Sequence, residues 1–144
     1  MEQKQVIEIC KMSDNASIPF RNTEHSAGLD LLTAYDYCIR PNEICRIKTD
    51  LQIKIPPDSY GQISSRSSCA IKGLITLAGI IDADFRGNIV IVVINLSRNT
   101  IFVSKKDRIA QLIIIKIYNQ FEISEVEKLD DTSRGAKGFG SSGR

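Results

Sequence analysis

The sequence has few residues that build metal sites and no apolar run long enough to cross a membrane. Its 144 residues include four cysteines and a single histidine, His25. No two cysteines form a CxxC pair, and a zinc site usually needs four closely spaced Cys or His ligands, so we expect none. We interpret the cysteines as reduced thiols packed as small apolar groups, and His25 as an exposed loop residue. The longest apolar run, residues 89–94, is far shorter than the roughly 20 residues of a membrane helix.

The chain also has little excess of one sign of charge, with 19 Lys and Arg against 17 Asp and Glu. The formal net charge is +2, and the basic residues are dispersed along the chain. A protein that binds a nucleic-acid polymer usually carries a basic stripe, so such a partner is not expected. Residues 1–12 mix acidic and basic side chains with apolar ones, unlike a secretory signal. These features predict a soluble, intracellular protein with no membrane or nucleic-acid partner.

The sequence is instead rich in short strand patterns. Residues 51–55 alternate between apolar and polar side chains and stop at a Pro-Pro-Asp turn. Residues 89–94 and 112–117 are nearly continuous runs of Ile, Val and Leu, typical of strands covered on both faces. Because a small β-domain seldom covers two such strands alone, we expect an oligomer. Together with one short helix near residues 68–72, this favours an all-β, distorted jelly-roll sandwich or barrel. Further strands are expected at residues 6–9, 44–49, 60–64 and 100–103.

The composition changes after Leu129. We therefore predict a β jelly-roll core over residues 1–129 and a flexible Gly/Ser-rich tail over residues 130–144. Glycines let backbone N–H groups approach a phosphate, serines and Arg134 add donors, and Phe139 offers a face for a base. The competing interpretation of this tail is a plain unstructured terminus.

Two further segments could hold an anion or a metal. Residues 64–68, Ser-Ser-Arg-Ser-Ser, combine hydroxyls and a guanidinium at the start of the expected helix. The alternative there is a helix start capped by a serine. In residues 79–87, Asp82 and Asp84 stand two apart on an extended segment, so both carboxylates point to one side. The alternative there is a hairpin turn served by Asp84 and Gly87.

Two weaker segments complete the set. Residues 27–31 place Asp30 inside an apolar strand segment, and in residues 107–112 Gln111 interrupts an apolar run. A polar residue in a strand usually just faces water, so neither segment is informative alone.

In this order, the five segments resemble the five motifs of the trimeric dUTPase family, from Ala27 to Gly143. The resemblance implies a homotrimer in which each active site draws on all three subunits, and the tail closes over the site of a neighbour. It implies a dUTP diphosphatase that uses Mg²⁺ to hydrolyse dUTP to dUMP and pyrophosphate by in-line water attack at the α-phosphorus. Such an enzyme lowers dUTP and supplies dUMP for thymidylate synthesis.

The resemblance also implies a role for individual residues. Asp82 corresponds to the catalytic base, and Asp30 to an acid that reaches the magnesium ion through water. Uracil specificity is expected from backbone groups of a hairpin between Leu74 and Ile81. The residues implied in phosphate binding are Arg66, Ser67, Ser68, Gln111, Arg134, Ser141 and Ser142. Those implied in nucleoside binding are Thr76, Gly79, Ile81, Phe85 and Phe139.

The chain departs from the family pattern in its second and third motifs. Where the family reads Pro-Arg-Ser-Gly-Leu, this chain has Ser-Arg-Ser-Ser-Cys at residues 65–69. Ser68 in place of glycine is expected to crowd the phosphate approach, and Phe85 replaces a tyrosine while keeping the ring. Two other functions stay open: a nucleotide-binding or protein-interaction module without turnover, and deamination of dCTP.

Overall fold

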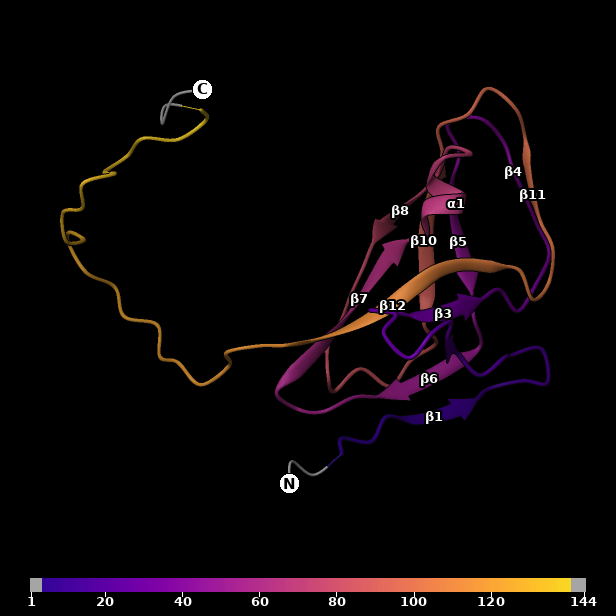
Figure 1. Cartoon of the computed structure of the whole chain (residues 1–144), viewed down its shortest axis with the longest axis horizontal. Coiled ribbons are helices and arrows are strands. Elements are labelled where there is room, and N and C mark those ends of the chain that lie inside the picture. Colours follow the sequence, from indigo (N-terminus) through magenta and orange to yellow (C-terminus); the bar gives the residue numbers. More distant parts are fainter. Residues whose placement is uncertain (1–3, 141–144) are drawn as a thin grey trace.

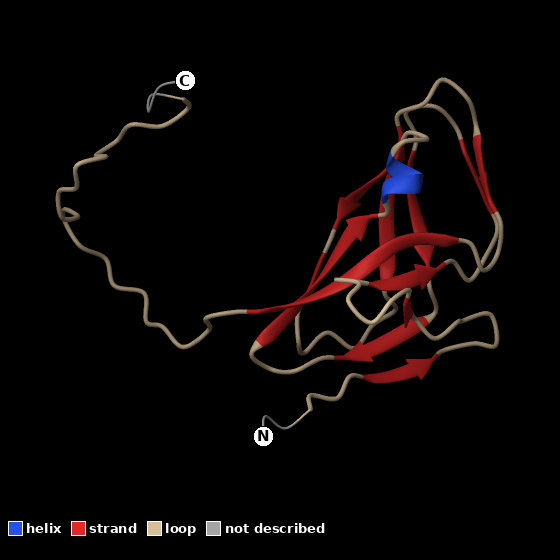
Figure 2. Cartoon of the chain, viewed as in Figure 1, coloured by secondary structure: helices blue, strands red, loops and turns tan. Residues whose placement is uncertain are grey.

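The computed structural model describes residues 4–140. Ser141 and Ser142, implied in phosphate binding, lie outside the described residues. The described chain is nearly all β-structure with one short helix (Figures 1 and 2). The elements are β1 (Glu8–Lys11), β2 (Phe20–Arg21), β3 (Leu29–Leu32), β4 (Tyr37–Ile39), β5 (Ile44–Lys48), β6 (Leu51–Lys54), β7 (Ser59–Ser65), α1 (Ser67–Ala70), β8 (Leu74–Ala78), β9 (Ile80–Ile81), β10 (Val90–Asn95), β11 (Ile101–Val103) and β12 (Arg108–Lys116).

The strands form a distorted jelly-roll sandwich. The largest sheet has the order β2-β3-β12-β7-β9, and the facing sheet has the order β5-β10-β8. Two-stranded ribbons, β1-β6 and β11-β4, complete the fold. Strands distant in sequence lie side by side: β12 pairs antiparallel with both β3 and β7. The all-β prediction with a single short helix is confirmed.

The core forms where alternate residues of these strands point inward. In β6, Leu51 and Ile53 are fully buried while Lys54 is exposed, as the period of two predicts. In β10, Ile91 and Val93 are buried between the sheets. The other large apolar side chains that are fully enclosed are Leu31, Ile39, Ile47, Ile89 and Leu112.

The two strands expected to be covered on both faces are covered on only one within a single chain. In β10, Val90, Val92 and Ile94 face away from the core and stay half-buried. Ile113 and Ile115 of β12 do the same. The apolar outer faces are the reason these runs lack alternation.

The predicted hairpin between residues 74 and 81 is wrong. β8 pairs with β10, whereas β9 pairs with β7, so the chain changes partner at Gly79. The Gly79 carbonyl accepts a hydrogen bond from the Ile63 N–H at 3.0 Å. Alternation along a sequence identifies strands, but hydrogen-bond partners depend on the tertiary fold.

The cysteines are all free thiols, and Cys45 and Cys69 are half-buried and pack against the core, as predicted. Cys10 and Cys38 are exposed because they lie in the two ribbons, β1-β6 and β11-β4, so their prediction as packed apolar groups is wrong. His25 is an exposed loop residue, as predicted. Within the described range, no helix is long and apolar enough to span a bilayer.

The chain leaves the sandwich after β12. Residues 117–140 contain no helix or strand and run away from the sandwich, the orange-to-yellow path in Figure 1. The sequence placed the end of the core at residue 129 because apolar residues continue to that point. In the structure these side chains are solvent-exposed: Tyr118, Phe121, Ile123, Val126 and Leu129.

Candidate functional site

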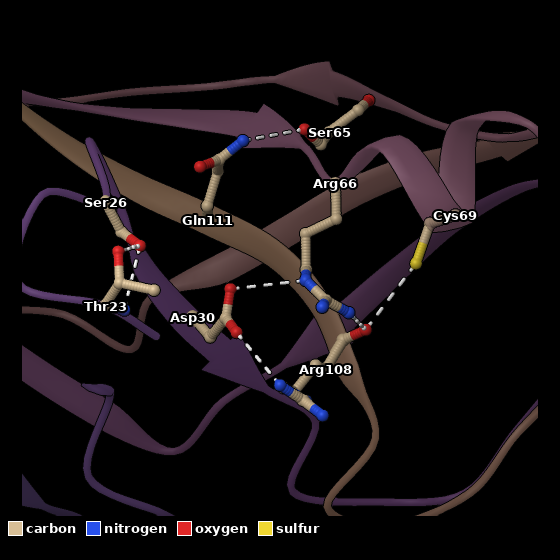
Figure 3. A network of polar contacts seen from close by, with 8 residues as sticks. All are labelled: Thr23, Ser26, Asp30, Ser65, Arg66, Cys69, Arg108 and Gln111. Atoms are coloured by element: carbon tan, nitrogen blue, oxygen red, sulfur yellow. Dashed lines mark hydrogen bonds and ion pairs between the residues drawn. The ribbon is translucent and has the colours of Figure 1, made fainter. Parts of the chain in front are cut away.

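A buried acid between two arginines forms the centre of the first candidate cluster (Figure 3). Asp30 of β3 is 8% exposed, and its Oδ1 lies 3.2 Å from Arg66 Nε. Its Oδ2 lies 3.5 Å from Arg108 Nη1 on the neighbouring β12. Arg66 Nη1 also donates to the Arg108 carbonyl at 3.0 Å. The guanidinium of Arg66 is thus fixed at the end of β7 before any ligand arrives.

Asp30 keeps one acceptor available. Its Oδ2 is buried yet has no hydrogen-bond partner, only the longer charge contact with Arg108. A buried carboxylate oxygen of this kind is uncommon and is suited to a bound water. No group of three or more His, Cys, Asp or Glu side chains among residues 4–140 could hold a metal by itself. A magnesium ion here fits only if phosphate oxygens and water supply most of its ligands, which is its usual preference.

Gln111 links three of the five sequence segments. Its Nε2 donates to the Ser65 carbonyl at 3.1 Å, and Ser65 Oγ accepts from the Thr76 N–H at 2.9 Å. Gly28 lies against the same side chain, because a Cβ at this position would be 2.6 Å from Gln111 Oε1. The structure therefore brings Asp30, Arg66, Gln111 and Thr76 into one region across β3, β12, β7 and β8.

Helix α1 begins two residues after the end of β7. Arg66, with extended backbone angles, takes the N-cap position and makes no side-chain cap bond, so the alternative of a serine N-cap is wrong. Ser67 and Ser68 are both exposed in the first turn. Cys69 Sγ lies 3.5 Å from the Arg108 carbonyl, the acceptor that Arg66 also uses (Figure 3).

The second candidate region is the loop between β9 and β10. Asp82 and Asp84 are exposed and line one pocket of about 490 Å³, consistent with carboxylates two residues apart pointing to one side. The Phe85 N–H bonds to the Asp82 carbonyl at 3.0 Å, so the chain does turn here. It is no simple hairpin, because β9 and β10 pair with other strands. The Phe85 ring packs on Gly87, where a Cβ would lie 2.6 Å from its Cζ.

These regions are not joined into one site within a single chain. Asp82 takes part in none of the ion pairs that hold Asp30 and Arg66. Arg134 bonds within the tail itself, from Nε to the Lys137 carbonyl at 3.1 Å. Phe139 is fully exposed.

The structure adds two residues to the site that the sequence did not assign. Arg108 is the second cation on Asp30, and Ser65 bonds the β8 backbone. Arg108 stands in the fifth candidate segment, so a search for a cation opposite the buried acid could have found it. Ser65 gave no such signal, because its role depends on the pairing of β7 with its neighbours.

The family model described as dUTPase matches residues 14–143, nearly the whole chain. The chain belongs to the dUTPase family. It is 45% identical over 139 residues to the mitochondrial deoxyuridine 5'-triphosphate nucleotidohydrolase of Homo sapiens. The match covers 96% of this chain and 55% of the human protein, so the chain spans about half of that relative's length.

Solved dUTPase structures share the fold. The dUTPase of Staphylococcus bacteriophage 80alpha with dUPNHPP has a TM-score of 0.90 and 32% identity, covering 96% of this chain and 99% of that one. A mutant dUTPase from phage phi11 of S. aureus, which reveals the coordination of a structural Mg(II) ion, has a TM-score of 0.82 and 27% identity. That match covers 88% of this chain and 99% of the phage chain. The jelly-roll assignment is thus confirmed by comparison as well as by topology.

Proposed function

We propose that this chain hydrolyses dUTP to dUMP and pyrophosphate, with Asp82 as the general base. Family membership over nearly the whole chain supports the reaction. The observation that carries the assignment of the base is the placement of Asp82 on an exposed turn next to the ring of Phe85, which packs on Gly87. A solvent-exposed carboxylate on a fixed turn can hold and deprotonate a water.

The reaction is an in-line displacement. A water oxygen bonds to the α-phosphorus as the bond to the bridging oxygen of the leaving pyrophosphate breaks, and the water proton passes to Asp82. Negative charge grows on the pyrophosphate, and Arg66 and Arg134 stabilise it. Arg66 is already oriented by Asp30, so little reorganisation is needed when the triphosphate binds.

The remaining residues bind the ends of the nucleotide. Phe85 packs against the deoxyribose, Phe139 covers the base, and the backbone around Thr76, Gly79 and Ile81 recognises uracil. The phosphates are bound by Ser67, Ser68, Gln111, Ser141 and Ser142 together with the two arginines. Gln111 can serve because Gly28 leaves room for its side chain beside Ser65.

Magnesium is the cofactor of this proposal. The free Oδ2 of Asp30 would hold it through water, with the phosphates supplying direct ligands. When bound, Mg²⁺ supplies charge compensation on the triphosphate. The phi11 relative with a structural Mg(II) ion supports this assignment.

Three copies of the chain assemble the complete site. The half-buried outer faces of β10 and β12 supply an apolar surface for a second copy. The tail, residues 130–144, closes over the site of a neighbour, which accounts for the exposure of Phe139 in a single chain. Light scattering of the purified protein tests the trimer.

Replacement of the base tests the function. With Mg²⁺ and dUTP, Asp82→Asn should release pyrophosphate several orders of magnitude more slowly than the parent, because its amide cannot accept the water proton. Asp84→Asn is the matched control: it lines the same pocket, and most turnover should remain. An Asp82→Asn protein as fast as the parent would show that another group is the base. A parent that binds dUTP without releasing pyrophosphate would favour the binding module, and ammonia release from dCTP would favour the deaminase.

A further inference from the structure

The loop that carries Asp82 is fastened to the turn between β5 and β6 and to the start of β6. Hydrogen bonds with residues 49, 51 and 52 attach its C-terminal leg, residues 86–89. Gln52 Nε2 donates to the Arg86 carbonyl at 2.5 Å, and the Ile89 N–H donates to the Leu51 carbonyl at 2.8 Å. Thr49 Oγ1 donates to the Ile89 carbonyl at 2.7 Å. The leg is therefore anchored by backbone and side-chain bonds to the turn and to the first residues of β6.

A further attachment is the pair of residues Asp50 and Asn88, which we call the Asp50–Asn88 clasp. Asn88 Nδ2 donates to Asp50 Oδ1 at 2.8 Å, and the Asp50 N–H donates to Asn88 Oδ1 at 3.0 Å. The two bonds close a ring in which each residue both donates and accepts. Asp50 has φ +54°, a left-handed backbone that Asp and Asn tolerate better than other side chains.

The second oxygen of Asp50 joins the clasp to two more segments. Its Oδ2 accepts from Ser13 Oγ at 2.6 Å and from the Tyr35 hydroxyl at 2.5 Å. Burial alone would raise the pKa of the Asp50 carboxyl, but hydrogen bonds from Ser13, Tyr35 and Asn88, with Lys48 nearby, hold that pKa below its usual value. Asp50 is thus a buried carboxylate with both oxygens hydrogen-bonded, and its hydrogen-bond partner on the Asp82 loop is Asn88.

The loop itself is braced by contacts among residues 83–87. Arg86 Nη1 donates to the Ala83 carbonyl at 2.7 Å and to the Phe85 carbonyl at 3.0 Å. Gly87 receives the Phe85 ring at close contact. At the other end, β9 is held by β7. These contacts connect the leg that carries Asn88 to the turn that carries Asp82.

We propose that Asp50 and Asn88 are positioning residues for dUTP hydrolysis: their clasp sets the placement of the Asp82 carboxylate without touching the substrate. This inference rests on the proposed role of Asp82 as the base. A general base must lie within hydrogen-bond reach of its water, and a misplacement of 1 Å can reduce a rate by about 10²-fold. The clasp therefore acts on kcat more than on KM.

Reversing the two side chains tests the proposal. Asn88→Asp places two carboxylates face to face across a 2.8 Å contact, which disfavours the ionised pair, so kcat should fall by roughly 10²-fold with a smaller change in KM. In the double variant Asp50→Asn/Asn88→Asp, the new amide donates to the new carboxylate. The oxygen of the new amide still accepts hydrogen bonds from Ser13 and Tyr35. That variant should recover kcat to near the parent value, and an unrescued double variant would overturn the proposal.

Ser13→Ala is the matched control for a purely structural role. It removes one hydrogen bond from the same carboxylate, on the side away from the Asp82 loop. It should lower the melting temperature while kcat stays at the parent value; an equal loss of kcat would overturn the proposal.

Should Asn88→Asp fail to fold, Asn88→Ala removes the clasp without adding charge, and an unchanged kcat there would also overturn it. Asp82→Asn, measured in parallel, separates the two ideas: if that variant stays active, the assignment of the base fails rather than the clasp.

Discussion

Gly28→Ala is expected to reduce both stability and substrate affinity, although it adds a single methyl group. Gly28 precedes β3, and its missing Cβ leaves the space occupied by Gln111 of β12. A Cβ there would lie 2.6 Å from Gln111 Oε1 and 2.9 Å from Gln111 Cβ. Rotation of the side chain can move Oε1, but Cβ is fixed to the backbone. The strands β3 and β12 must therefore separate.

The size of the effect follows from these contacts. Overpacking a tight interior contact costs about 1–3 kcal/mol, and the displaced Gln111 also loses its bond to the Ser65 carbonyl, about 1 kcal/mol. A loss of about 2–4 kcal/mol lowers the melting temperature on the order of 10 °C. If Gln111 contacts a phosphate, the loss of one charge-assisted bond of about 1.5–3 kcal/mol raises KM for dUTP about tenfold or more. Asp30, two residues along β3, moves with the strand and takes Arg66 with it.

Two assays check this prediction: thermal unfolding at one fixed protein concentration, and steady-state pyrophosphate release. Gly138→Ala is the control for stability, because a Cβ there meets no atom within 4 Å. The prediction is refuted if Gly28→Ala melts with the parent and keeps its KM. A lower melting temperature with an unchanged KM would remove Gln111 from the phosphate site but keep the packing argument.

Three other predictions follow from the electrostatics, the tail and the cofactor. Because its folded pKa is depressed, Asp50 stabilises the protein above its unfolded pKa of about 3.9, and this stability is lost as the pH falls through the folded pKa. Thermal melts from neutral to acidic pH should therefore show a smaller decline for Asp50→Asn than for the parent. Deletion of residues 131–144 should leave a folded trimer by light scattering but sharply reduce pyrophosphate release, and unchanged turnover would reject a lid. Chelation of divalent ions with EDTA should suppress turnover, with recovery on adding Mg²⁺, whereas full activity in EDTA would exclude the proposed cofactor.

Much of the fold was predictable because apolar periodicity depends on local sequence. The alternation at residues 51–55 placed β6, and the Ile- and Val-rich run at residues 89–94 placed β10 to within one residue. Where the core ends stays a prediction: β12 ends at Lys116, and the apolar side chains from there to Leu129 are exposed in the single chain. The same local logic also predicted that β8 and β9 pair with each other as a hairpin, because alternation carries no information about which strand lies beside a given strand.

The sequence by itself determined the family and the all-β class, and it predicted which acids, arginines and glycines form the site, because those depend on residue type and order. Only the tertiary structure decided which of them meet. Asp30 lies between Arg66 and Arg108, and Asp50 bonds Asn88, because strand pairing joins positions far apart along the chain. The same pairing leaves Asp82 out of the arginine cluster within one chain. Contacts of this kind follow from long-range hydrogen bonding and packing, which a local pattern of side chains does not specify.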